Sequence, residues 1–289
     1  MVKVSVVIPS IGRPIITETI ESVLSQTLQD FEVIVVGRNV EWLKEVYPTE
    51  RLIVIEEEGN QAYCRNVGVE KARGKYIAFV DDDDLWTPDK LKKQVMLHDS
   101  GVKFSFTGIR YFTKDEKGEM KTLLTRTKFN GNLQKILLYE NIIPTSSVMV
   151  NKDVFLEVGG FDKDFVTCED WDLWLRLVQR LDQDDIGYIP EPLLLYRVHP
   201  KQTTSLERYL EGRIRLIEKH NVVRDTRKIR SFHEMEITYL KYILGKANFL
   251  DVVLAGMKNV LYPSNIRLIL SRVFDERRKI YEAKKGFNV

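Results

Sequence analysis

The sequence predicts an α/β fold with a mainly parallel central sheet flanked by helices, followed by a C-terminal helical extension. Two observations carry this prediction. Over the first hundred residues, short runs rich in β-branched residues alternate with helical patterns, which is typical of βαβ units and of a parallel sheet covered on both faces. From about Ser205 onward, the apolar residues follow helical spacing alone.

Four strands and two helices are predicted in the first hundred residues. The strands are expected at 2–9, 31–36, 51–55 and 76–80. A helix over 16–26 follows Pro14, a residue suited to a first turn, and a helix over 61–72 ends before Gly74, a plausible C-cap. Strands joined by crossovers of this length favour parallel pairing.

The pattern changes between residues 102 and 150 to shorter strand-like pieces. A polar hairpin signal lies at 114–118, and we interpret the region as an antiparallel or irregular insertion that ends in a strand at 147–150. Helices are then predicted over 152–158, stopped by Gly159 and Gly160, and over 169–181. Core packing is the expected role of Trp174.

Charge is unevenly spread along a chain whose formal net charge is only +2. Residues 1–204 hold 26 basic and 32 acidic side chains, whereas residues 205–289 hold 18 and 10. The C-terminal apolar residues recur at helical spacing from Phe249 to Val260 and again from Ile266 to Val273. A basic amphipathic extension admits two interpretations: an interfacial helix on a membrane, or the favoured helical lid docked on the sheet domain.

These patterns divide the 289 residues into a sheet domain at 1–204 and a basic helical extension at 205–289. Cys64 and Cys168 have no paired spacing, which argues against a disulfide framework or a zinc site and favours a reducing compartment. The N-terminus lacks signal-peptide features, and no apolar stretch reaches spanning length. We therefore expect a cytoplasmic protein, or one bound peripherally at the inner face of the membrane.

Four consecutive acids, residues 81–84, directly follow the predicted strand at 76–80. They would gather where the strand leaves the sheet, the usual ligand position in open α/β folds. Like charges this close need a counter-charge, and hard oxygen ligands suit Mg²⁺ or Mn²⁺. The alternative is a solvated acidic turn before a helix capped by Thr87, Pro88 and Asp89.

Two further clusters lie downstream. GGFD at 159–162 leads to a second acidic group that contains Glu169 and Asp170, and YRVHP at 196–200 adds His199. Each cluster has a structural alternative, because acids at a helix N-terminus interact favourably with the helix dipole and a lone histidine is more often a structural residue than a ligand.

Taken in order, these motifs resemble those of the family 2 glycosyltransferases, inverting enzymes built on the GT-A fold. The family's first strand and nucleotide-binding turn are matched by VSVVIPS at 4–10. Its helix, second glycine and D-x-D metal motif are matched by RNVG at 65–68 and ARGKYIAFVDDDD at 72–84. Its acceptor-side segment is matched by GGFD and by EDWDL at 169–173. The resemblance covers roughly residues 1–205, with a nucleotide-binding half at 1–100 and an acceptor-side half at 101–204.

The resemblance implies a role for each matched position. Asp170 would be the general base, and Glu169 and Trp171 would lie on the acceptor side. Asp83 and Asp81 would hold Mg²⁺ or Mn²⁺, which stabilises the leaving diphosphate. A metal or diphosphate contact is implied for His199. The residues implied to bind the nucleotide-sugar are Pro9, Ser10, Asn60, Arg65, Asp81 and Asp82.

Two departures from the family pattern concern the nucleotide base. The usual Asp-Asp-Gly-Ser segment after the second strand is replaced by Gly37, Arg38, Asn39 and Val40, so its acid is missing. The usual Tyr-Asn pair of the first turn is replaced by Ile11 and Gly12, which removes an aromatic ring that would stack on the base. Arg38 could instead contact a phosphate or a different base edge.

The expected function is transfer of a sugar from a nucleotide-diphosphate donor to a hydroxyl acceptor, a glycan or a lipid-linked sugar, with possible peripheral contact between the basic C-terminal helices and the membrane. One alternative is a sugar nucleotidyltransferase, although the loop at 10–14 is too short for that class. The other is a non-catalytic glycan-binding or scaffolding homologue. Nucleic acid is not an expected partner, because the basic residues accompany no recognised binding motif.

Overall fold

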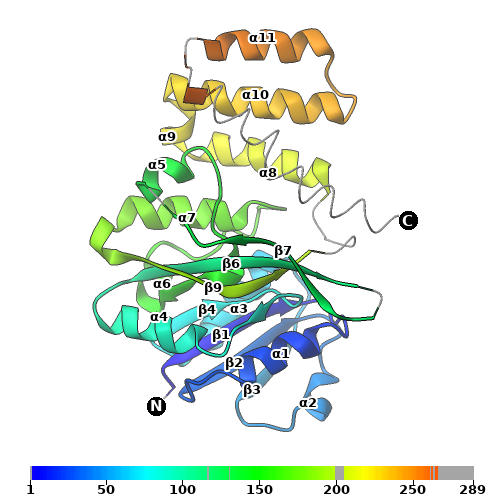
Figure 1. The fold of residues 1–289 in the computed structure, drawn as a ribbon, viewed down its shortest axis with the longest axis vertical. Helices are drawn as coiled ribbons and strands as arrows, with labels where there is room; N and C mark the ends of the chain where they lie inside the picture. Colours follow the sequence, from blue (N-terminus) through cyan, green and yellow to red (C-terminus); the bar gives the residue numbers. More distant parts are fainter. Residues whose placement is uncertain are drawn as a thin grey trace. The chain divides into compact units, whose positions relative to one another are not determined.

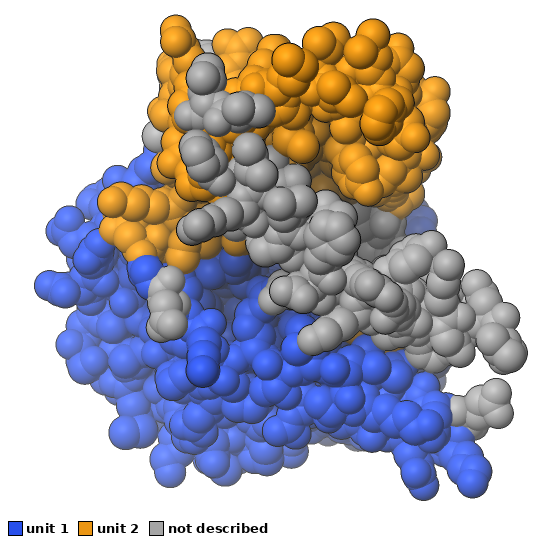
Figure 2. Space-filling model, turned by 45° about the horizontal axis from the view of Figure 1, so that its top comes forward, with its two compact units in different colours: residues 1–131, 142–163, 170–197 blue, residues 132–141, 164–169, 198–289 orange. Residues whose placement is uncertain are grey.

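A computed structural model describes residues 2–115, 117–129, 131–198, 205–260, 262, 264 and 265. The chain divides into two compact units, coloured separately in Figure 2. Unit 1 comprises residues 1–131, 142–163 and 170–197, and unit 2 comprises residues 132–141, 164–169 and 198–289. The expected domain boundary at 204 falls outside the described residues and stays a prediction.

The β-branched runs of the first hundred residues form the parallel half of the sheet in unit 1 (Figure 1). The strands are β1 (Val4–Ser10), β2 (Phe31–Gly37), β3 (Leu52–Glu56) and β4 (Tyr76–Phe79). β1 pairs in parallel with both β2 and β4, and β2 pairs in parallel with β3. Every residue of β1 and β2 is buried, as a strand covered on both faces requires.

The helices of this half are α1 (Ile16–Leu24), α2 (Leu43–Val46) and α3 (Gln61–Lys71). α3 lies close against β1 at Gly68, where a Cβ atom would come within 2.4 Å of Val7 Cγ1. The chain after α3 is held to the sheet by Glu32, whose carboxylate accepts from Ser5 Oγ and from Arg73 Nε, both at 2.7 Å. A charge buried in β2 is thereby paired and hydrogen-bonded.

The remaining strands complete an order of β3-β2-β1-β4-β8-β6-β9-β5, with β7 paired to β6. They are β5 (Leu85–Trp86), β6 (Phe104–Lys114), β7 (Met120–Arg126), β8 (Met149–Asn151) and β9 (Ile186–Arg197). β6 and β7 form the predicted antiparallel hairpin, and β8 joins β4 and β6 antiparallel. The predicted α/β fold, a sheet flanked by helices, is confirmed.

β9 was not predicted from the sequence. Pro190 and Pro192 interrupt its apolar run, and proline is disfavoured inside a strand. The structure accommodates them where the parallel pairing of β9 with β6 shifts register around Gly108. A Cβ atom on Gly108 would lie 2.7 Å from the Glu191 carbonyl oxygen, so glycine is required there.

The other helical segments of unit 1 are α4 (Lys90–Asp99), α6 (Lys152–Glu157), nearly all of α7 (Glu169–Arg180), and the 3₁₀ turns η1 (Thr145–Ser147) and η2 (Gln183–Asp185). α6 ends before Gly159 and Gly160, both with positive φ, as predicted. Trp174 is fully buried, and its Nε1 donates to the Ile143 carbonyl oxygen at 3.1 Å. Its predicted core role is confirmed.

The regular elements in the described part of unit 2 are mainly the helices α5 (Leu133–Leu137), α8 (Leu206–Lys219), α9 (Asn221–Arg224), α10 (Arg227–Ile243) and α11 (Phe249–Val260). α8, α10 and α11 stack one on the next (Figure 1). Buried Arg213 of α8 donates to His233 Nδ1 of α10 at 2.8 Å and also to Glu236. None of the described helices is long and apolar enough to cross a bilayer. The predicted repeat after Pro263 lies outside the described residues.

Candidate active site

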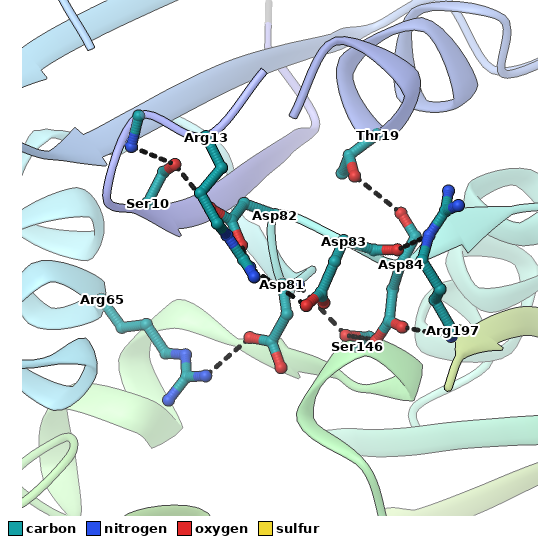
Figure 3. Close-up of polar contacts among 11 residues, drawn as sticks. Ser10, Arg13, Thr19, Arg65, Asp81, Asp82, Asp83, Asp84, Ser146 and Arg197 are labelled. Atoms are coloured by element: carbon teal, nitrogen blue, oxygen red, sulfur yellow. Dashed lines mark hydrogen bonds and ion pairs between the residues drawn. The ribbon is translucent and has the colours of Figure 1, made fainter. Parts of the chain in front are cut away.

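The four consecutive acids lie at the sheet edge where β1 and β4 both end. These strands are parallel neighbours with Val7 opposite Phe79, so their carboxyl ends meet at one edge. Ser10 at the end of β1 therefore reaches Asp82, and its Oγ donates to Asp82 Oδ2 at 2.6 Å (Figure 3). The acidic run thus has the position at the strand end that its sequence context predicts.

The four carboxylates divide into two that are bonded inward and two that stay partly exposed. Asp82 and Asp84 are 5% and 1% exposed. Ser146 Oγ donates to Asp84 Oδ2 at 2.6 Å. By contrast, the side chains of Asp81 and Asp83 are 27% and 20% exposed. Solvent therefore reaches the first and third acids of the run.

Two arginines from separate segments supply positive charge to these acids (Figure 3). Arg13, in the loop after β1, donates from Nη2 to both Asp82 and Asp83, the latter at 3.0 Å. Arg65 of α3 donates to Asp81 Oδ1 at 2.7 Å. Burial tends to lower the pKa of Arg13, but the hydrogen bonds to Asp82 and Asp83 and the charges of these two acids together outweigh that effect and raise the pKa. These guanidinium groups offset the repulsion between neighbouring carboxylates.

Arg197, the last residue of β9, organises the backbone of the same turn. Its Nε donates to the Asp83 carbonyl oxygen at 2.8 Å, and its backbone N–H donates to Asp84 Oδ1 at 2.9 Å. Its Nη2 donates to Glu18 Oε2 at 2.7 Å, an oxygen that also accepts from Lys114 Nζ. Burial tends to raise the pKa of Glu18, but these two hydrogen bonds and the positive charges of their donors together outweigh it and lower the pKa. Glu18 therefore stays charged and holds Arg197 in place.

Burial changes the proton affinity of two acids in the run. It raises the pKa of Asp81, to which the charge of Asp83 adds, although Arg65 acts in the opposite direction. Burial raises the pKa of Asp84 well above its ordinary value, with a further contribution from Asp83. Both shifts arise because several carboxylates are buried close together.

The turn η1 touches both the acidic run and the start of α7. Ser146 Oγ accepts from Asp81 N at 3.0 Å, in addition to its bond to Asp84. Thr145 Oγ1 lies 3.5 Å from Asp170 Oδ2. Asp170 Oδ1 accepts from the backbone N–H of Trp171 at 2.7 Å. Adjacent residues of one short turn therefore bring the acidic run and Asp170 into one site.

The segment before α7 is tied to α3 by a reciprocal pair of hydrogen bonds. Asn66 Nδ2 donates to the Phe161 carbonyl oxygen at 2.7 Å, and Phe161 N donates to Asn66 Oδ1 at 2.9 Å. The Arg65 guanidinium lies 5.2 Å from the centre of the Phe161 ring. RNVG and GGFD, two motifs far apart in the sequence, thus form one contact that positions Arg65.

Two residues predicted to bind the nucleotide-sugar have structural partners. Asn60 is the N-cap of α3: its Oδ1 accepts from Tyr63 N at 2.9 Å, and its Nδ2 donates to the Lys163 carbonyl oxygen at 2.6 Å. Pro9 is buried within β1, opposite Val36 of β2. These contacts give each residue a role in shaping the site whether or not it touches a ligand.

The predicted acceptor-side residues differ in exposure. Trp171 is only 2% exposed, so its indole is part of the core. Glu169, the first residue of α7, is partly exposed. His199, the third predicted metal ligand, lies outside the described residues. Neither Thr87 nor Asp89 caps α4 with its side chain. Asp89 accepts from Thr27 Oγ1 at 2.8 Å, and Thr87 Oγ1 donates to the Leu193 carbonyl oxygen at 3.5 Å. The helix cap that the solvated-turn interpretation of the acidic run predicts is therefore not formed.

A carboxylate reaches the loop after β2, although the family's acid is missing from it. Glu56, the last residue of β3, accepts hydrogen bonds from the backbone N–H groups of Asn39 and Val40, the latter at 2.9 Å. The Val40 N–H contributes most to lowering the pKa of Glu56. Arg38 is exposed in this loop. The loop is therefore organised by an acid from the neighbouring strand.

The site residues without a role assigned from the sequence include Arg13, Ser146 and Arg197. Arg13 follows the first strand, so the rule that loops at this edge bind ligands could have singled it out. Arg197 belongs to β9, a strand that the sequence did not predict because it contains two prolines. Ser146 lacks any local signal, because its partners lie more than sixty residues away.

Comparison with known proteins identifies relatives of this chain. A family model described as "Glycosyltransferase like family 2" matches residues 5–219. The O-antigen biosynthesis glycosyltransferase WbnJ of Escherichia coli is 32% identical over 194 residues, which cover 64% of this chain and 75% of that protein. The uncharacterized glycosyltransferase MJ1057 of Methanocaldococcus jannaschii is 33% identical over 219 residues, covering 71% and 73%. An uncharacterized glycosyltransferase of Rickettsia bellii is 31% identical over 223 residues, which cover 74% of this chain but only 32% of that protein.

Among solved structures, Staphylococcus aureus TarS 1–349 has a similar fold. Its complex with UDP-GlcNAc aligns with a TM-score of 0.59 at 17% identity and covers 82% of this chain and 71% of that one. Its complex with UDP aligns with a TM-score of 0.55 at 14% identity and covers 95% and 92%. The predicted GT-A type fold is confirmed by this likeness.

Proposed function

Because the chain belongs to glycosyltransferase-like family 2, we propose that it is a metal-dependent inverting glycosyltransferase that moves a sugar from a nucleotide diphosphate to a hydroxyl acceptor. One observation carries this proposal. Thr145 of η1 contacts Asp170, and the adjacent Ser146 holds Asp81 and Asp84. A candidate base and a set of acids suited to a metal–diphosphate complex are thus joined by a single turn.

The proposed donor is a nucleotide-diphosphate sugar. TarS, which shares the fold, has been crystallised with UDP-GlcNAc and with UDP. In this chain the ends of β1, β2 and β4 would face the donor, because ligands bind at the carboxyl ends of parallel strands. The exposed Arg38, in the loop that Glu56 organises, is the proposed contact to a phosphate or a base edge.

The donor set of the acidic run fits Mg²⁺ or Mn²⁺. Asp81 and Asp83, the ends of a D-x-D motif, keep exposed carboxylate surface, whereas Asp82 and Asp84 are bonded inward. No group of three His, Cys, Asp or Glu side chains in the described part of the chain is arranged to hold a cation by itself. Mg²⁺ commonly takes one or two carboxylates and completes its shell with phosphate oxygens and water. Such an ion would neutralise the diphosphate as it departs.

The proposed reaction is a single displacement. The acceptor oxygen attacks the anomeric carbon from the face opposite the diphosphate, the bond from that carbon to the diphosphate oxygen breaks, and Asp170 takes the hydroxyl proton. The Trp171 N–H and Thr145 Oγ1 orient the Asp170 carboxylate. A positioned general base accelerates such a step by about a hundredfold to ten-thousandfold.

The proposed acceptor is a glycan or a lipid-linked sugar, and the proposed pathway is polysaccharide biosynthesis. WbnJ, a relative at 32% identity, is named for O-antigen biosynthesis. The proposed location is the cytoplasm, at the inner face of the membrane. Cys64 and Cys168 are not joined in a disulfide, which is compatible with a reducing compartment.

Titration with nucleoside diphosphates tests the donor and the metal together. UDP, GDP, CDP and dTDP are each added with and without Mn²⁺ while thermal unfolding is followed, because a ligand of the native state raises its stability. We expect one diphosphate to stabilise the protein only when the metal is present. A flat response to all four would favour a non-catalytic homologue, and release of pyrophosphate during turnover would identify a nucleotidyltransferase.

Two substitutions separate the proposed metal ligand from the proposed base. Asp83→Asn is expected to weaken metal-dependent binding of the diphosphate, because a carboxylate ligand is lost. Asp170→Asn is expected to keep that binding but to lower turnover by about a hundredfold or more. Binding is measured by calorimetry and turnover by release of nucleoside diphosphate. Asp153→Asn, at an exposed position of α6, is the matched control and should change neither quantity. Near-normal turnover of Asp170→Asn would exclude Asp170 as the base.

A further inference from the structure

The helical hairpin of α10 and α11 in unit 2 exposes a large number of apolar side chains. Six of them define what we name the α10–α11 apolar face: Tyr242, Ile243, Phe249, Leu250, Leu254 and Met257. Phe249, Leu250 and Met257 are 67%, 63% and 62% exposed. Contiguous apolar surface of this kind on a folded protein marks a site of contact with another protein or with a membrane.

The hairpin that presents this face has defined internal contacts. Asn259 of α11 is fully buried, and its Nδ2 donates to the Ser231 carbonyl oxygen of α10 at 3.0 Å. The rings of Tyr242 and Phe249 lie 6.4 Å apart and join the two helices at the turn. In α11 the polar Asn259 is therefore buried against α10, while several apolar side chains are exposed. An ordinary surface helix has the opposite arrangement, with its apolar residues facing the core.

The spacing along α11 places its exposed residues on one side. Leu250, Leu254 and Met257 stand at i, i+4 and i+7, and Phe249 precedes them by one position. Tyr242 of α10 adds a ring with a polar hydroxyl, a type of side chain that is favoured at the boundary between apolar and aqueous phases. The face thus combines aliphatic residues with aromatic residues, as interfacial helices do.

Charge at the margin of the face decides which partner fits. Residues 237–260 contain three basic side chains, Lys241, Lys246 and Lys258, and one acid, Asp251. Lys258 also pairs with Glu234 of α10 at 3.6 Å, a carboxylate that already accepts from Arg230 Nε at 2.8 Å. Asp251 accepts from Asn248 N at 2.9 Å, so its negative charge interacts with the N-terminus of α11. The margin is therefore positive.

Two other occupants would bring like charges together. A second copy of the chain would present the same positive margin. The C-terminal residues 266–289, the other occupant considered, hold seven basic and three acidic side chains and so carry the same sign of charge. An anionic bilayer has the opposite sign and an apolar interior, so it satisfies both features of the face.

We propose that the α10–α11 apolar face docks on the surface of an anionic phospholipid bilayer, with its leucines, Phe249 and Met257 at the level of the acyl chains and its lysines among the headgroups. The hairpin would lie in the plane of the interface, since no described helix is suited to cross it. In this proposal the apolar surface supplies most of the binding to the membrane, and the lysines add electrostatic attraction to the anionic headgroups. This inference does not depend on the proposed transferase reaction.

Flotation of the full-length protein with vesicles tests the proposal. Vesicles of phosphatidylcholine alone are compared with vesicles that contain about a third phosphatidylglycerol, at low and at high salt, because surface electrostatics are screened by salt. We expect binding to the anionic vesicles. Leu250→Ser combined with Leu254→Ser should reduce the bound fraction by about tenfold or more, since two aliphatic side chains that the bilayer would bury are lost. Lys246→Gln combined with Lys258→Gln should reduce it less and make it less sensitive to salt.

A matched pair of substitutions controls for the loss of exposed apolar surface in general. Met96 of α4 and Leu156 of α6 are 65% and 50% exposed in unit 1, and Met96→Ser with Leu156→Ser should leave flotation unchanged. Nucleotide binding by every variant is measured in parallel, so that a failed membrane contact and a failed transferase assignment give different results.

Several results would overturn the proposal. The wild-type protein could fail to float at low salt, or the leucine variant could float as well as the wild type, which would assign binding to basic residues alone. Sedimentation could show a dimer that the leucine variant dissociates, which would assign the face to self-association. A large drop in the unfolding temperature of that variant would show that the chain itself covers the face, because substitutions at exposed sites change stability little.

Discussion

Residues 81–84 place four carboxylates next to one another, and each has its own set of partners. Asp82 is bonded to Ser10 and Arg13, while Asp81 is paired with Arg65. At the scale of single residues, the site is stable because each negative charge meets a specific donor. Arg65 is especially constrained, since it is 1% exposed and lies over the Phe161 ring.

Removal of Arg65 is expected to leave Asp81 among charges of its own sign. Arg65→Met should lower the free energy of unfolding by about 1–3 kcal/mol, less than for a fully buried pair, because Asp81 is partly exposed. Adding Asp81→Asn should restore part of that loss, since the unpaired charge is then gone. Urea denaturation of the two single variants and the double variant measures this coupling. Strictly additive effects would show that the pair does not contribute as a unit.

At the scale of elements, close contacts between backbones position the site. α3 approaches β1 at Gly68, and this approach sets where Arg65 stands relative to the end of the sheet. η1 then joins the acidic run to the start of α7 through Thr145 and Ser146. At Gly68 the neighbouring strand leaves no room for a side chain, whereas Gly256 of α11 has space around it.

Alanine at two helical glycines should have opposite effects on stability. A Cβ atom at Gly68 would lie 2.4 Å from Val7 Cγ1, so Gly68→Ala should destabilise the protein by about 1–3 kcal/mol through overpacking. At Gly256 the nearest atom is Met235 Cε at 3.9 Å, so Gly256→Ala should stabilise α11 by up to about 1 kcal/mol. Thermal unfolding of both variants measures the difference. Adding Val7→Ala to Gly68→Ala should recover part of the loss, and a failure to do so would contradict this reading of the α3–β1 contact.

At the scale of the whole molecule, a buried polar network cross-links α4 to the sheet. His98 of α4 bonds through Nε2 to Ser105 Oγ of β6 at 2.9 Å and through Nδ1 to Asn151 Oδ1 of β8 at 2.8 Å. Burial is the main cause that lowers the pKa of His98 to about 4, from an ordinary value of 6.5. Folding thus keeps this imidazole neutral where the unfolded chain would protonate it.

Stability should therefore fall as the pH drops from 6.5 toward 4. The unfolded state binds the proton first, so the contribution of His98 is fully present above pH 6.5 and is lost progressively below it. Between pH 7.5 and pH 5 the expected loss is about 2 kcal/mol. Urea midpoints at the two pH values, compared between the wild type and His98→Gln, measure this term. An equal pH dependence in both proteins would exclude His98 as its source.

The parts of the site that sequence patterns predicted are those with local signals. The acidic run follows an apolar strand, and GGFD ends a helix, so both could be placed without tertiary information. Asp170 could be assigned only through the family resemblance, because its partner Thr145 is twenty-five residues away. Arg197 was missed because prolines in β9 conceal the strand that carries it to Asp84.

The amino-acid sequence alone determined the α/β fold class, the first four strands, the family resemblance and the acidic motif, since periodicity and short motifs are properties of neighbouring residues. Only the tertiary structure decided which acids face solvent, how η1 joins Asp170 to them, that Glu56 of β3 binds the loop after β2, and that α11 turns its apolar side outward. These features depend on strand pairing and helix contacts between distant segments. Such contacts arise when burial brings the segments together, and local patterns along the chain do not encode them.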